Sequence, residues 1–288
     1  MSGWIEIAGP RLATLRRTPL RATFIERPHR FAARCTLRGG REVLAHLPNP
    51  GRLTGVLAPR CQLLLDGPYP PARALPYTMV AARAGGSGFI TRSRGLLQPS
   101  HAGCETGPCV WVGTNTIYAN RVFPALVSGG LFPELADRTG FATSAPRPDR
   151  AAKTRQEAPT AVIESEVAHG RSRFDFRIGG IMVEVKSVTL AKGHAGAFPD
   201  AVSVRAARHC DELAALCGAG NPTALVFVAQ RGDVESVAPE DGIDPVFGAA
   251  LRRAAAAGVL VIACALDVAP AGAARARRVP VCLQGSPR

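Results

Sequence analysis

The chain has 288 residues, of which 47% are hydrophobic, and a formal net charge of +13 at pH 7. This length supplies one large domain or two ordinary ones, each with a sizeable core. No apolar run approaches the roughly 18 residues that span a bilayer, and the N-terminal segment carries Glu6 and no apolar stretch typical of a secretory signal. We therefore expect a cytoplasmic protein with no membrane-spanning helix.

The excess of positive charge indicates an acidic partner. A soluble protein this basic usually meets a polyanion, and nucleic acid is the leading candidate. The alternative is a coding bias that enriches arginine and alanine and leaves a basic surface without a specific partner. Arginine supplies nearly all of the positive charge, because the only lysines are Lys153, Lys186 and Lys192.

The eight cysteines form no familiar metal-binding pattern. Cys104 and Cys109 are separated by four residues, and Cys210 and Cys217 by six, and neither spacing is typical of zinc ligands. In the cytoplasm we expect reduced thiols, several of them packed in the core as small apolar side chains.

Short strands separated by Gly and Pro turns dominate residues 20–95. The predicted strands cover residues 23–27, 31–37, 42–47, 61–65 and 77–83. A Gly39-Gly40 turn joins the second strand to the third, and residues 53–57 are predicted to form a short helix. Five short strands within about 70 residues predict an OB-fold-like barrel, a fold that often binds nucleic acid.

Residues 92–109 form a connector that contains Gly, Ser and Pro, so we expect a second domain over residues 108–268. A strand and a helix over residues 110–127 begin this domain, with Asn115 or Thr116 as the helix N-cap. The later predicted elements are a disordered insertion at 137–159, a strand at 162–167, a hairpin at 172–190, a helix at 200–217, a strand at 224–230, a helix at 244–257, a strand at 259–265 and a frayed basic tail after 270. A sheet covered by helices follows, of α/β or α+β type.

The hairpin is the most informative segment of the chain. Its two strands flank Gly179-Gly180, a strong signal for a two-residue turn. This turn sets the register, so that Asp175 lies directly opposite Glu184. The predicted apolar face consists of Phe174, Phe176, Ile178, Ile181, Val183 and Val185. The predicted polar face consists of Arg173, Asp175, Arg177, Met182, Glu184 and Lys186.

Asp175 and Glu184 repel one another when they lie opposite on adjacent strands. A hard divalent cation with oxygen ligands is the natural compensation, and Lys186 shares a face with Glu184. The alternative is an ordinary solvated face on which Arg173 and Arg177 neutralise the two acids without a metal.

Motifs in both halves resemble the sugar fermentation stimulation (SfsA) family, over roughly residues 21–265. In the first domain they are Phe24-Ile-Glu-Arg-Pro-His-Arg-Phe and Ala45-His-Leu-Pro-Asn-Pro-Gly-Arg-Leu. In the second they are Ser172-Arg-Phe-Asp-Phe, Val183-Glu-Val-Lys-Ser-Val-Thr-Leu, Phe198-Pro-Asp-Ala-Val, Arg208-His209 and Glu212-Leu213. The resemblance implies an OB-fold followed by a PD-(D/E)XK nuclease-like domain, with DNA binding and regulation of sugar metabolism as functions.

The resemblance also implies roles for residues of the hairpin. Asp175 and Glu184 match acids that hold Mg²⁺, and Lys186 matches a lysine that orients or activates the attacking water. Glu166 is a candidate for a further acid, with an exposed strand position as its alternative. The helix after residue 110 carries no acid, and Asn120 either takes that place or serves as a cap or a solvent-exposed residue.

Basic residues in both domains are candidate contacts to nucleic acid. They are Arg52, Arg173, Arg205, Arg208 and His209. Arg205 and His209 are four residues apart and share a helix face, where they contact phosphates or form an ordinary solvated surface. The Asn49–Arg52 segment is either a nucleic-acid-binding loop or a plain barrel turn.

Three functions remain open at this point. The first is a DNA-binding protein whose nuclease-like domain cleaves phosphodiester bonds with Mg²⁺. The second is a non-catalytic DNA-binding regulator of sugar (maltose) metabolism with a vestigial metal site. The third is a scaffold whose basicity reflects only coding bias. DNA is the expected partner in the first two, a membrane in none, and a homodimer is left open.

Overall fold

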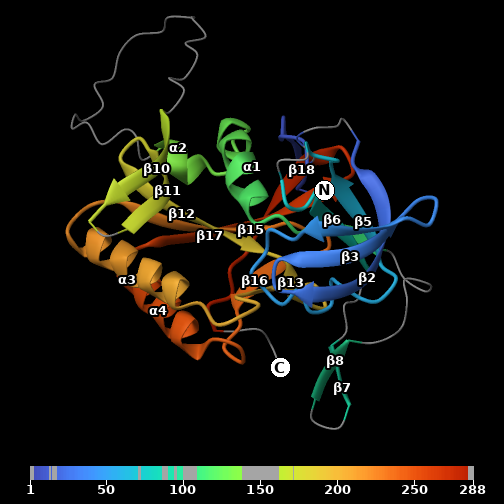
Figure 1. The fold of residues 1–288 in the computed structure, drawn as a ribbon. Coiled ribbons are helices and arrows are strands. Elements are labelled where there is room, and N and C mark those ends of the chain that lie inside the picture. The colour runs from blue at the N-terminus through green and yellow to red at the C-terminus, as the bar shows by residue number, and fades with distance from the viewer. Residues whose placement is uncertain are drawn as a thin grey trace, which may run out of the picture.

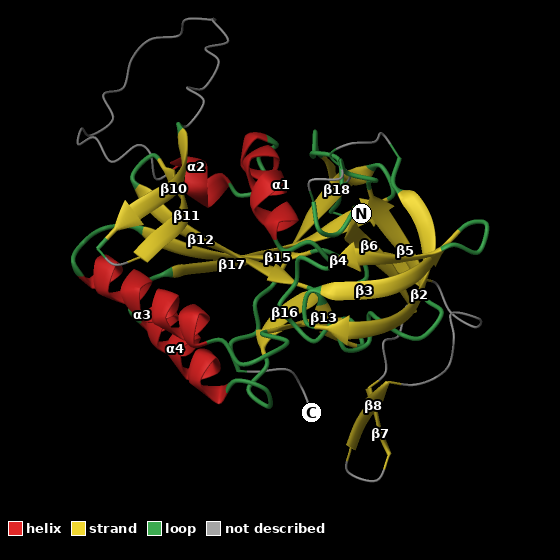
Figure 2. Ribbon diagram, in the orientation of Figure 1, coloured by secondary structure: helices red, strands yellow, loops and turns green. Residues whose placement is uncertain are grey.

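The computed structural model describes residues 3–12, 14, 18–70, 73–85, 90–93, 96–99, 109–137, 162–170 and 172–284. Figures 1 and 2 show a strongly curved N-terminal sheet beside a second sheet that carries helices on both faces. Nearly all of the insertion expected at 137–159, and most of the connector expected at 92–109, lie outside the described residues.

The N-terminal half is a closed five-stranded barrel. Its strands are β2 (Leu20–His29), β3 (Ala32–Leu37), β4 (Glu42–His46), β5 (Gln62–Asp66) and β6 (Tyr77–Gly85). Neighbours pair in the order β4-β3-β2-β5-β6, and a parallel pairing of β4 with β6 closes the ring. Inward side chains such as Cys35, Leu47, Leu63 and Met79 form one apolar core. The predicted OB-fold is confirmed.

Two turns of the barrel test the local predictions. Gly39 and Gly40 adopt positive φ angles of 99° and 87°, as the predicted tight hairpin turn requires. The helix predicted at 53–57 is wrong, because Leu53 and Gly55 have φ angles of 54° and 78° that a right-handed helix excludes. The segment forms turns instead.

The second half is built on a seven-stranded sheet with the order β1-β18-β17-β15-β12-β11-β10. These strands are β1 (Ile5–Glu6), β10 (Ile163–His169), β11 (Ser172–Ile178), β12 (Ile181–Val188), β15 (Thr223–Ala229), β17 (Leu260–Ala269) and β18 (Gly272–Val279). The central strands β12, β15 and β17 are parallel, whereas the outer pairings are antiparallel. Every residue of β15 is buried, as expected for a parallel strand covered on both faces.

Helices cover the two faces of this sheet (Figure 2). One face carries α1 (Ile117–Ser128) and α2 (Pro133–Asp137), and the other carries α3 (Val204–Gly218) and α4 (Pro245–Ala256). A separate apolar cluster lies on each side, so the predicted sheet between helices is confirmed. No helix in the described part of the chain is long and apolar enough to cross a membrane.

Several boundaries differ from the predictions. The helix expected from residue 200 begins at Val204, because the Ser203 side chain accepts a hydrogen bond from the Ala206 backbone N–H and caps it. The tail expected to fray forms β18, which pairs with β17 and extends the sheet past residue 268. Strand β9 (Cys109–Gly113) pairs with β6 of the barrel, although it lies within the 108–268 segment.

Three smaller features complete the described fold. Strands β13 (Leu190–Lys192), β14 (Ala195–Phe198) and β16 (Ser236–Pro239) form a small sheet, and β7 (Ile90–Ser93) pairs with β8 (Leu96–Pro99). Cys109 is part of a disulfide, which corrects the expectation of reduced thiols throughout. The six other cysteines in the described ranges are free.

The loop Asn49–Arg52 joins the barrel to the second half. The Asn49 side chain donates from Nδ2 to the carbonyl of Thr114 at 3.0 Å. On the other side, Asp200 accepts a hydrogen bond from the backbone N–H of Leu53 at 3.3 Å. A Cβ at Gly51 would lie 2.0 Å from the Asp200 carboxylate, so a larger residue at this position would displace the Asp200 side chain. The loop therefore packs between the start of α1 and the segment that leads into α3.

Candidate functional site

Asp175 lies where β11 and β12 separate. The two strands pair in the predicted register only from the turn to Phe176 opposite Val183, so the predicted pairing of Asp175 directly opposite Glu184 is not part of the ladder. Beyond that point the Asp175 carboxylate accepts a hydrogen bond from the Val185 backbone N–H at 2.8 Å and another from Asn120 Nδ2 at 2.6 Å. The Asp175 carboxylate thus takes the place of a strand carbonyl as the acceptor for the Val185 N–H, and Asn120 links it to α1.

The apolar face of the hairpin is shorter than predicted. Phe176 packs on the α1 side, with its ring centroid 4.9 Å from that of Phe123. Phe174 packs in the cluster on the α3 side, with its ring 5.8 Å from the ring of His209. Strict alternation would place both phenylalanines on one face, so β11 twists at Asp175 between them. This twist brings the carboxylate to the edge of β12.

Glu184, Lys186 and His209 form a buried cluster on the α3 side of β12. Their exposed fractions are 3%, 9% and 1%. Lys186 Nζ lies 2.5 Å and His209 Nδ1 lies 2.6 Å from the same oxygen, Glu184 Oε1. The other oxygen, Glu184 Oε2, is buried and has no hydrogen-bond partner among the described residues. Buried polar atoms are nearly always paired, so this one requires an explanation.

His209 acts as a donor to Glu184. Arg205 Nε donates to His209 Nε2 at 3.3 Å, which leaves Nδ1 as the nitrogen that carries the proton. Arg205 and His209 therefore share a helix face as predicted, but only Arg205 is exposed to solvent. We assign His209 to the support of Glu184 and no longer to a direct phosphate contact.

The two carboxyl groups have opposite electrostatic environments. Burial, together with the nearby charge of Glu184, raises the pKa of Asp175 from its ordinary 3.8 to about 6. Burial alone would also raise the pKa of Glu184, but the hydrogen bond from His209 and the charge of Lys186 outweigh it and lower that pKa. Glu184 is therefore held ionised, whereas the surroundings of Asp175 oppose its ionisation.

The arginines of the hairpin do not neutralise these acids. Arg177 pairs with Glu164, with an Nε–Oε1 distance of 2.9 Å, and Arg173 Nη1 lies 3.5 Å from Glu166 Oε2. Both partners, Glu164 and Glu166, lie on β10. The arginines therefore form ordinary exposed ion pairs with β10 and do not pair with Asp175 or Glu184. Glu166 is exposed and paired with Arg173, which agrees with the alternative that we gave for it.

The candidate nucleic-acid contacts divide into an exposed group and one buried residue. Arg173, Arg205 and Arg208 are exposed on β11 and α3, the elements that carry the acids or their partner. Arg52 is exposed in the loop that joins the barrel to the second half. These four side chains can reach a polyanion, whereas the ring of His209 is covered.

The donor set suits a hard cation with few protein ligands. No group of three or more His, Cys, Asp or Glu side chains in the described ranges is placed to hold a metal ion. Asp175 and Glu184 could contribute carboxylate oxygens, and Mg²⁺ usually keeps several waters beside one or two carboxylates. The unpartnered Glu184 Oε2 is the atom best suited to such a ligand role.

Two residues have a larger role than their sequence pattern predicts. Asn120 was expected to cap a helix or face solvent at least as readily as to enter the site, yet it holds Asp175. His209 was expected on the surface, yet it holds Glu184. The absence of an acid on α1 was the one sequence signal for Asn120, and the apolar neighbours of His209 on α3 were a weak signal for burial.

Comparisons with known proteins identify the family. Residues 25–90 match the model for the SfsA N-terminal OB domain, and residues 147–272 match the model for the sugar fermentation stimulation protein RE domain. A sugar fermentation stimulation protein homolog from Pelobacter propionicus is 33% identical over 93% of this chain and 100% of its own length. A homolog from Thioalkalivibrio sulfidiphilus is 34% identical over 88% and 91%.

A solved structure agrees with this relationship at the level of the fold. SfsA from Pyrococcus furiosus, described as a complex with Ca²⁺, superposes with a TM-score of 0.67 at 21% identity. The match covers 94% of this chain and 99% of that one. One family model matches the barrel, the other matches the second half, and the curated relatives extend over both, so this chain belongs to the sugar fermentation stimulation protein family.

Proposed function

We propose that this protein binds DNA and hydrolyses phosphodiester bonds with a divalent cation, with Mg²⁺ as the expected ion, at Asp175 and Glu184. One observation carries the proposal: Glu184 Oε2 is buried and has no hydrogen-bond partner in the described part of the chain, while the charge of Glu184 acts on Asp175, whose ionisation its surroundings oppose. A cation between the two carboxylates would take the unpaired oxygen as a ligand and offset their repulsion.

The cation assignment has support from outside the chain. The Pyrococcus furiosus relative was solved with Ca²⁺, a cation that also takes oxygen ligands. The motif in which Glu184 and Lys186 are separated by one residue, with Asp175 on the preceding strand, resembles the PD-(D/E)XK pattern. In that pattern the two acids hold the cation and the lysine acts on water.

The residues of the site have distinct roles in this proposal. When bound, the cation supplies Lewis-acid stabilisation of the charge that develops on the phosphate. Lys186 orients the attacking water and places its ammonium beside that charge. Asn120 and His209 are positioning residues, because they hold Asp175 and Glu184 in place before a cation binds.

Arginine contacts to phosphate supply the affinity for DNA. Arg173 is exposed on β11, which carries Asp175, and Arg205 and Arg208 are exposed on α3, which carries His209. Arg52 is exposed in the loop that leads out of the barrel. The net charge of +13 favours association with a polyanion over long distances. Phosphate contacts give affinity with little base readout, and that affinity falls as salt concentration rises.

A non-catalytic DNA-binding regulator of sugar metabolism is the second candidate. Lys186 is engaged with Glu184 at 2.5 Å, and α1 contributes the amide of Asn120 where many nucleases of this type place an acid. The first feature leaves the site with no free ammonium group, and the second leaves it with one carboxylate fewer. A protein that binds a cation and DNA without cleavage would tolerate them.

The deciding experiment measures cleavage and binding in the same samples. Labelled single-stranded, duplex and branched DNA is incubated with Mg²⁺ or Mn²⁺ and with wild type, Lys186→Ala or Asp175→Ala protein. Glu166→Ala serves as a matched control, because it removes an exposed acid from the neighbouring strand. Cleavage lost in the two site variants, with binding retained, supports the nuclease. Binding without cleavage in either metal supports the regulator.

A further inference from the structure

The hairpin between β2 and β3 ends in a turn that presents an aromatic ring to solvent. This turn is Arg30-Phe31, between the paired residues His29 and Ala32. Phe31 is 45% exposed, and no other aromatic side chain in the described ranges is exposed to this extent. An exposed ring keeps a large apolar face available to a flat partner.

The backbone of this turn is held in place on both sides of the ring. The Phe31 N–H donates to His29 Nδ1 at 3.3 Å, and the Phe31 carbonyl accepts a hydrogen bond from the Leu47 N–H at 2.9 Å. The Arg30 carbonyl accepts another from Arg27 Nη2 at 2.6 Å. The ring is therefore exposed on a fixed support, and a ligand that covers it does not need to order the turn first.

Arg27 connects the turn to the loop that joins the barrel to the second half. Its Nη1 donates to the carbonyls of Gly51 and Arg52 at 2.7 and 3.0 Å. Its Nη2 donates to the carbonyl of Asn49 at 3.1 Å as well as to that of Arg30. One guanidinium therefore fixes the turn and the loop against each other as a single surface.

Arg30 and Arg52 give this surface guanidinium groups that can meet a ligand. Arg30 Nε donates to the Pro50 carbonyl at 3.0 Å, and its guanidinium carbon lies 5.5 Å from the centroid of the Phe31 ring. Among the described residues, neither the Arg30 Nη atoms nor the Arg52 side chain has a hydrogen bond or an ion pair. Arg52 follows Pro50 by two residues, which is at most about 7 Å of chain, so both arginines can reach one bound strand.

The acidic side chains next to this surface are already engaged. Glu26, on the same hairpin, pairs with Arg34 at 2.9 Å. Asp200 accepts the Leu53 N–H on the other side of the loop, and burial raises the pKa of Asp200 above its ordinary value. The exposed side chains of the turn and the loop are therefore basic or apolar, which suits the phosphates and bases of a nucleic acid.

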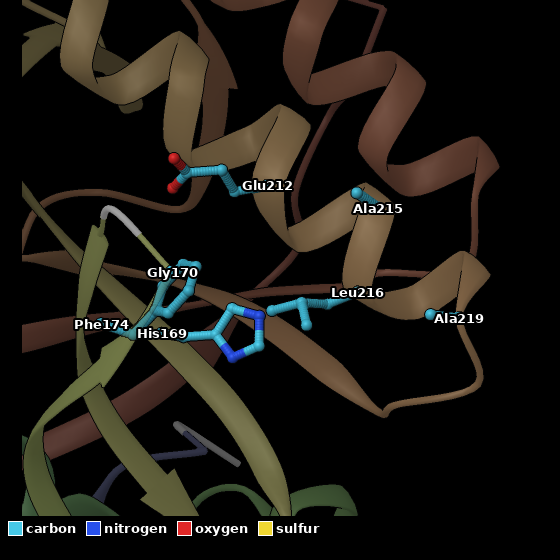
Figure 3. A pocket seen from close by; sticks show the side chains of 7 residues that line it. All are labelled: His169, Gly170, Phe174, Glu212, Ala215, Leu216 and Ala219. Carbon is cyan, nitrogen blue, oxygen red and sulfur yellow. The ribbon is translucent and has the colours of Figure 1, made fainter.

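The hollow on the other half of the molecule lacks this combination. It lies between the end of the β10–β11 hairpin and α3, and Figure 3 shows the side chains that line it. Its lining contains the carboxylate of Glu212 but no arginine or lysine. A phosphate would be repelled there, so the barrel turn is the better place for a nucleic acid strand.

We propose that Phe31 stacks on one base of a single DNA strand, while Arg30 and Arg52 contact the phosphates of that strand. Every base offers a face for stacking, so the turn gives affinity without reading a sequence. The ring can reach only a base that is not enclosed between its neighbours in a duplex, so the site favours single-stranded over paired DNA.

The stacking site adds the form of DNA to the proposed function, and it rests on that function only in that the protein must bind DNA. The turn and the loop hold no carboxylate that a cation would bridge, so their contacts with DNA need no divalent cation. Binding at the barrel can therefore be measured apart from cleavage.

The test measures DNA binding in a buffer without divalent cations. The ligands are a short thymine strand, an abasic strand of the same length and a duplex of that length, and fluorescence anisotropy gives each dissociation constant. The proteins are wild type, Phe31→Ala, Phe31→Tyr and Arg30→Gln. Val162→Ala is the matched control, because it shortens an apolar side chain that is 72% exposed beside β10 in the other half of the molecule.

Wild type should bind the thymine strand about tenfold more tightly than the abasic strand, a difference typical of one stacked base. Phe31→Ala should remove this difference and leave the affinities for the abasic strand and the duplex unchanged. Phe31→Tyr and Val162→Ala should retain it. Arg30→Gln should also retain it, and should lower the slope of log binding constant against log salt by about 0.7 for both single strands.

Equal affinity of wild type for the thymine and abasic strands overturns the stacking site. So does an equal loss in Phe31→Ala for all three ligands, because such a loss indicates a disturbed barrel. Absence of DNA binding in this buffer overturns it as well, and the cleavage assay with Mg²⁺ then decides the proposed function by itself. Cleavage with no effect of Phe31→Ala rejects only this inference, and a thymine preference without cleavage rejects only the nuclease.

Discussion

Two buried charge clusters belong to the adjacent central strands β12 and β15, and their hydrogen bonds are satisfied to different degrees. Arg231 follows β15 and forms a two-pronged pair with Asp233, with Nε–Oδ1 and Nη2–Oδ2 distances of 2.7 Å each. Its Nη1 donates to the Thr189 carbonyl at 3.1 Å. Glu184 on β12 instead receives Lys186 and His209 on a single oxygen, and its other oxygen has no hydrogen-bond partner within the ranges that the structure describes.

Under the proposed function, this difference separates a structural ion pair from a site that binds a cation. In the Arg231–Asp233 pair both carboxylate oxygens have guanidinium partners, so no ligand is needed. In the Glu184 cluster, an unpaired oxygen and the raised pKa of Asp175 remain as costs of folding. Such local costs are typical of functional sites, where a ligand removes them.

Breaking the structural pair should have the largest effect on stability. Asp233→Ala leaves the Arg231 guanidinium, which is 1% exposed, buried without its carboxylate. We expect a loss of about 3–5 kcal/mol in the free energy of unfolding, measured with urea. The control is Asp267→Ala, which removes the partner of Arg275 from a pair that is nearly half exposed and should cost about 1 kcal/mol or less. Similar losses in the two variants would contradict the distinction.

Removing the charge of Asp175 should stabilise the protein, in contrast to removing that of Asp233. In Asp175→Asn the buried charge disappears, so we expect the metal-free protein to gain about 1–2 kcal/mol in unfolding free energy. One of the two hydrogen bonds to the carboxylate is weakened, which keeps the gain below the full value of the pKa shift. The same variant should lose the stabilisation that a divalent cation gives to wild type, as measured by thermal unfolding with and without the cation.

The pH dependence gives a sharper form of this test. The pKa of Asp175 is raised from 3.8 to about 6 on folding, so the folded state favours the protonated form. The stability that protonation provides is complete below about pH 4 and is lost as the pH rises through 6. The advantage of Asp175→Asn over wild type should therefore appear between pH 4 and 6 and stay constant above that range. An advantage independent of pH would show that burial of the charge is not the cause.

The sequence predicted the architecture because its signals are local. Gly39-Gly40 and Gly179-Gly180 specify tight turns, and the turns set the strand registers of both hairpins. The prediction of a helix at 53–57 was wrong because apolar spacing does not reveal that Leu53 adopts a positive φ angle. The prediction of a frayed tail after residue 270 was wrong for another reason. The segment is rich in arginine, which suggested a solvated tail, yet it forms β18 and pairs with β17.

The site was only partly visible in the sequence, because its supporting contacts join distant elements. The residues Asp175, Glu184 and Lys186 follow from one hairpin and from the family resemblance. Asn120 and His209 reach them from α1 and α3, and their roles depend on how these helices pack on the sheet. A four-residue spacing placed Arg205 and His209 on one helix face, but no local pattern shows which of the two faces the core.

The support from His209 should have a moderate effect on cation binding. In His209→Ala, Glu184 loses the donor that fixes its Oε1, and we expect about tenfold weaker Mn²⁺ affinity, in the range seen for contacts that orient metal ligands. Calorimetric titration of the folded protein measures this change, and His209→Gln should recover part of the affinity through its amide donor. Leu213→Ala removes a fully buried side chain one turn further along α3 and controls for packing. An equal loss of affinity in this control would assign His209 a structural role.

The smallest expected effect is on the salt dependence of DNA binding, and its test compares two ion pairs of similar exposure. Arg173 pairs with Glu166 beside the site, and Arg253 pairs with Asp211 on the far side of α3, with side-chain exposures of 64% and 60%. Arg173→Ala should lower the slope of log binding constant against log salt by about 1, because one phosphate contact is lost. Arg253→Ala should leave the slope unchanged. Each variant loses one positive charge, so equal slopes would mean that the total charge of the protein, rather than the surface around Asp175, attracts DNA.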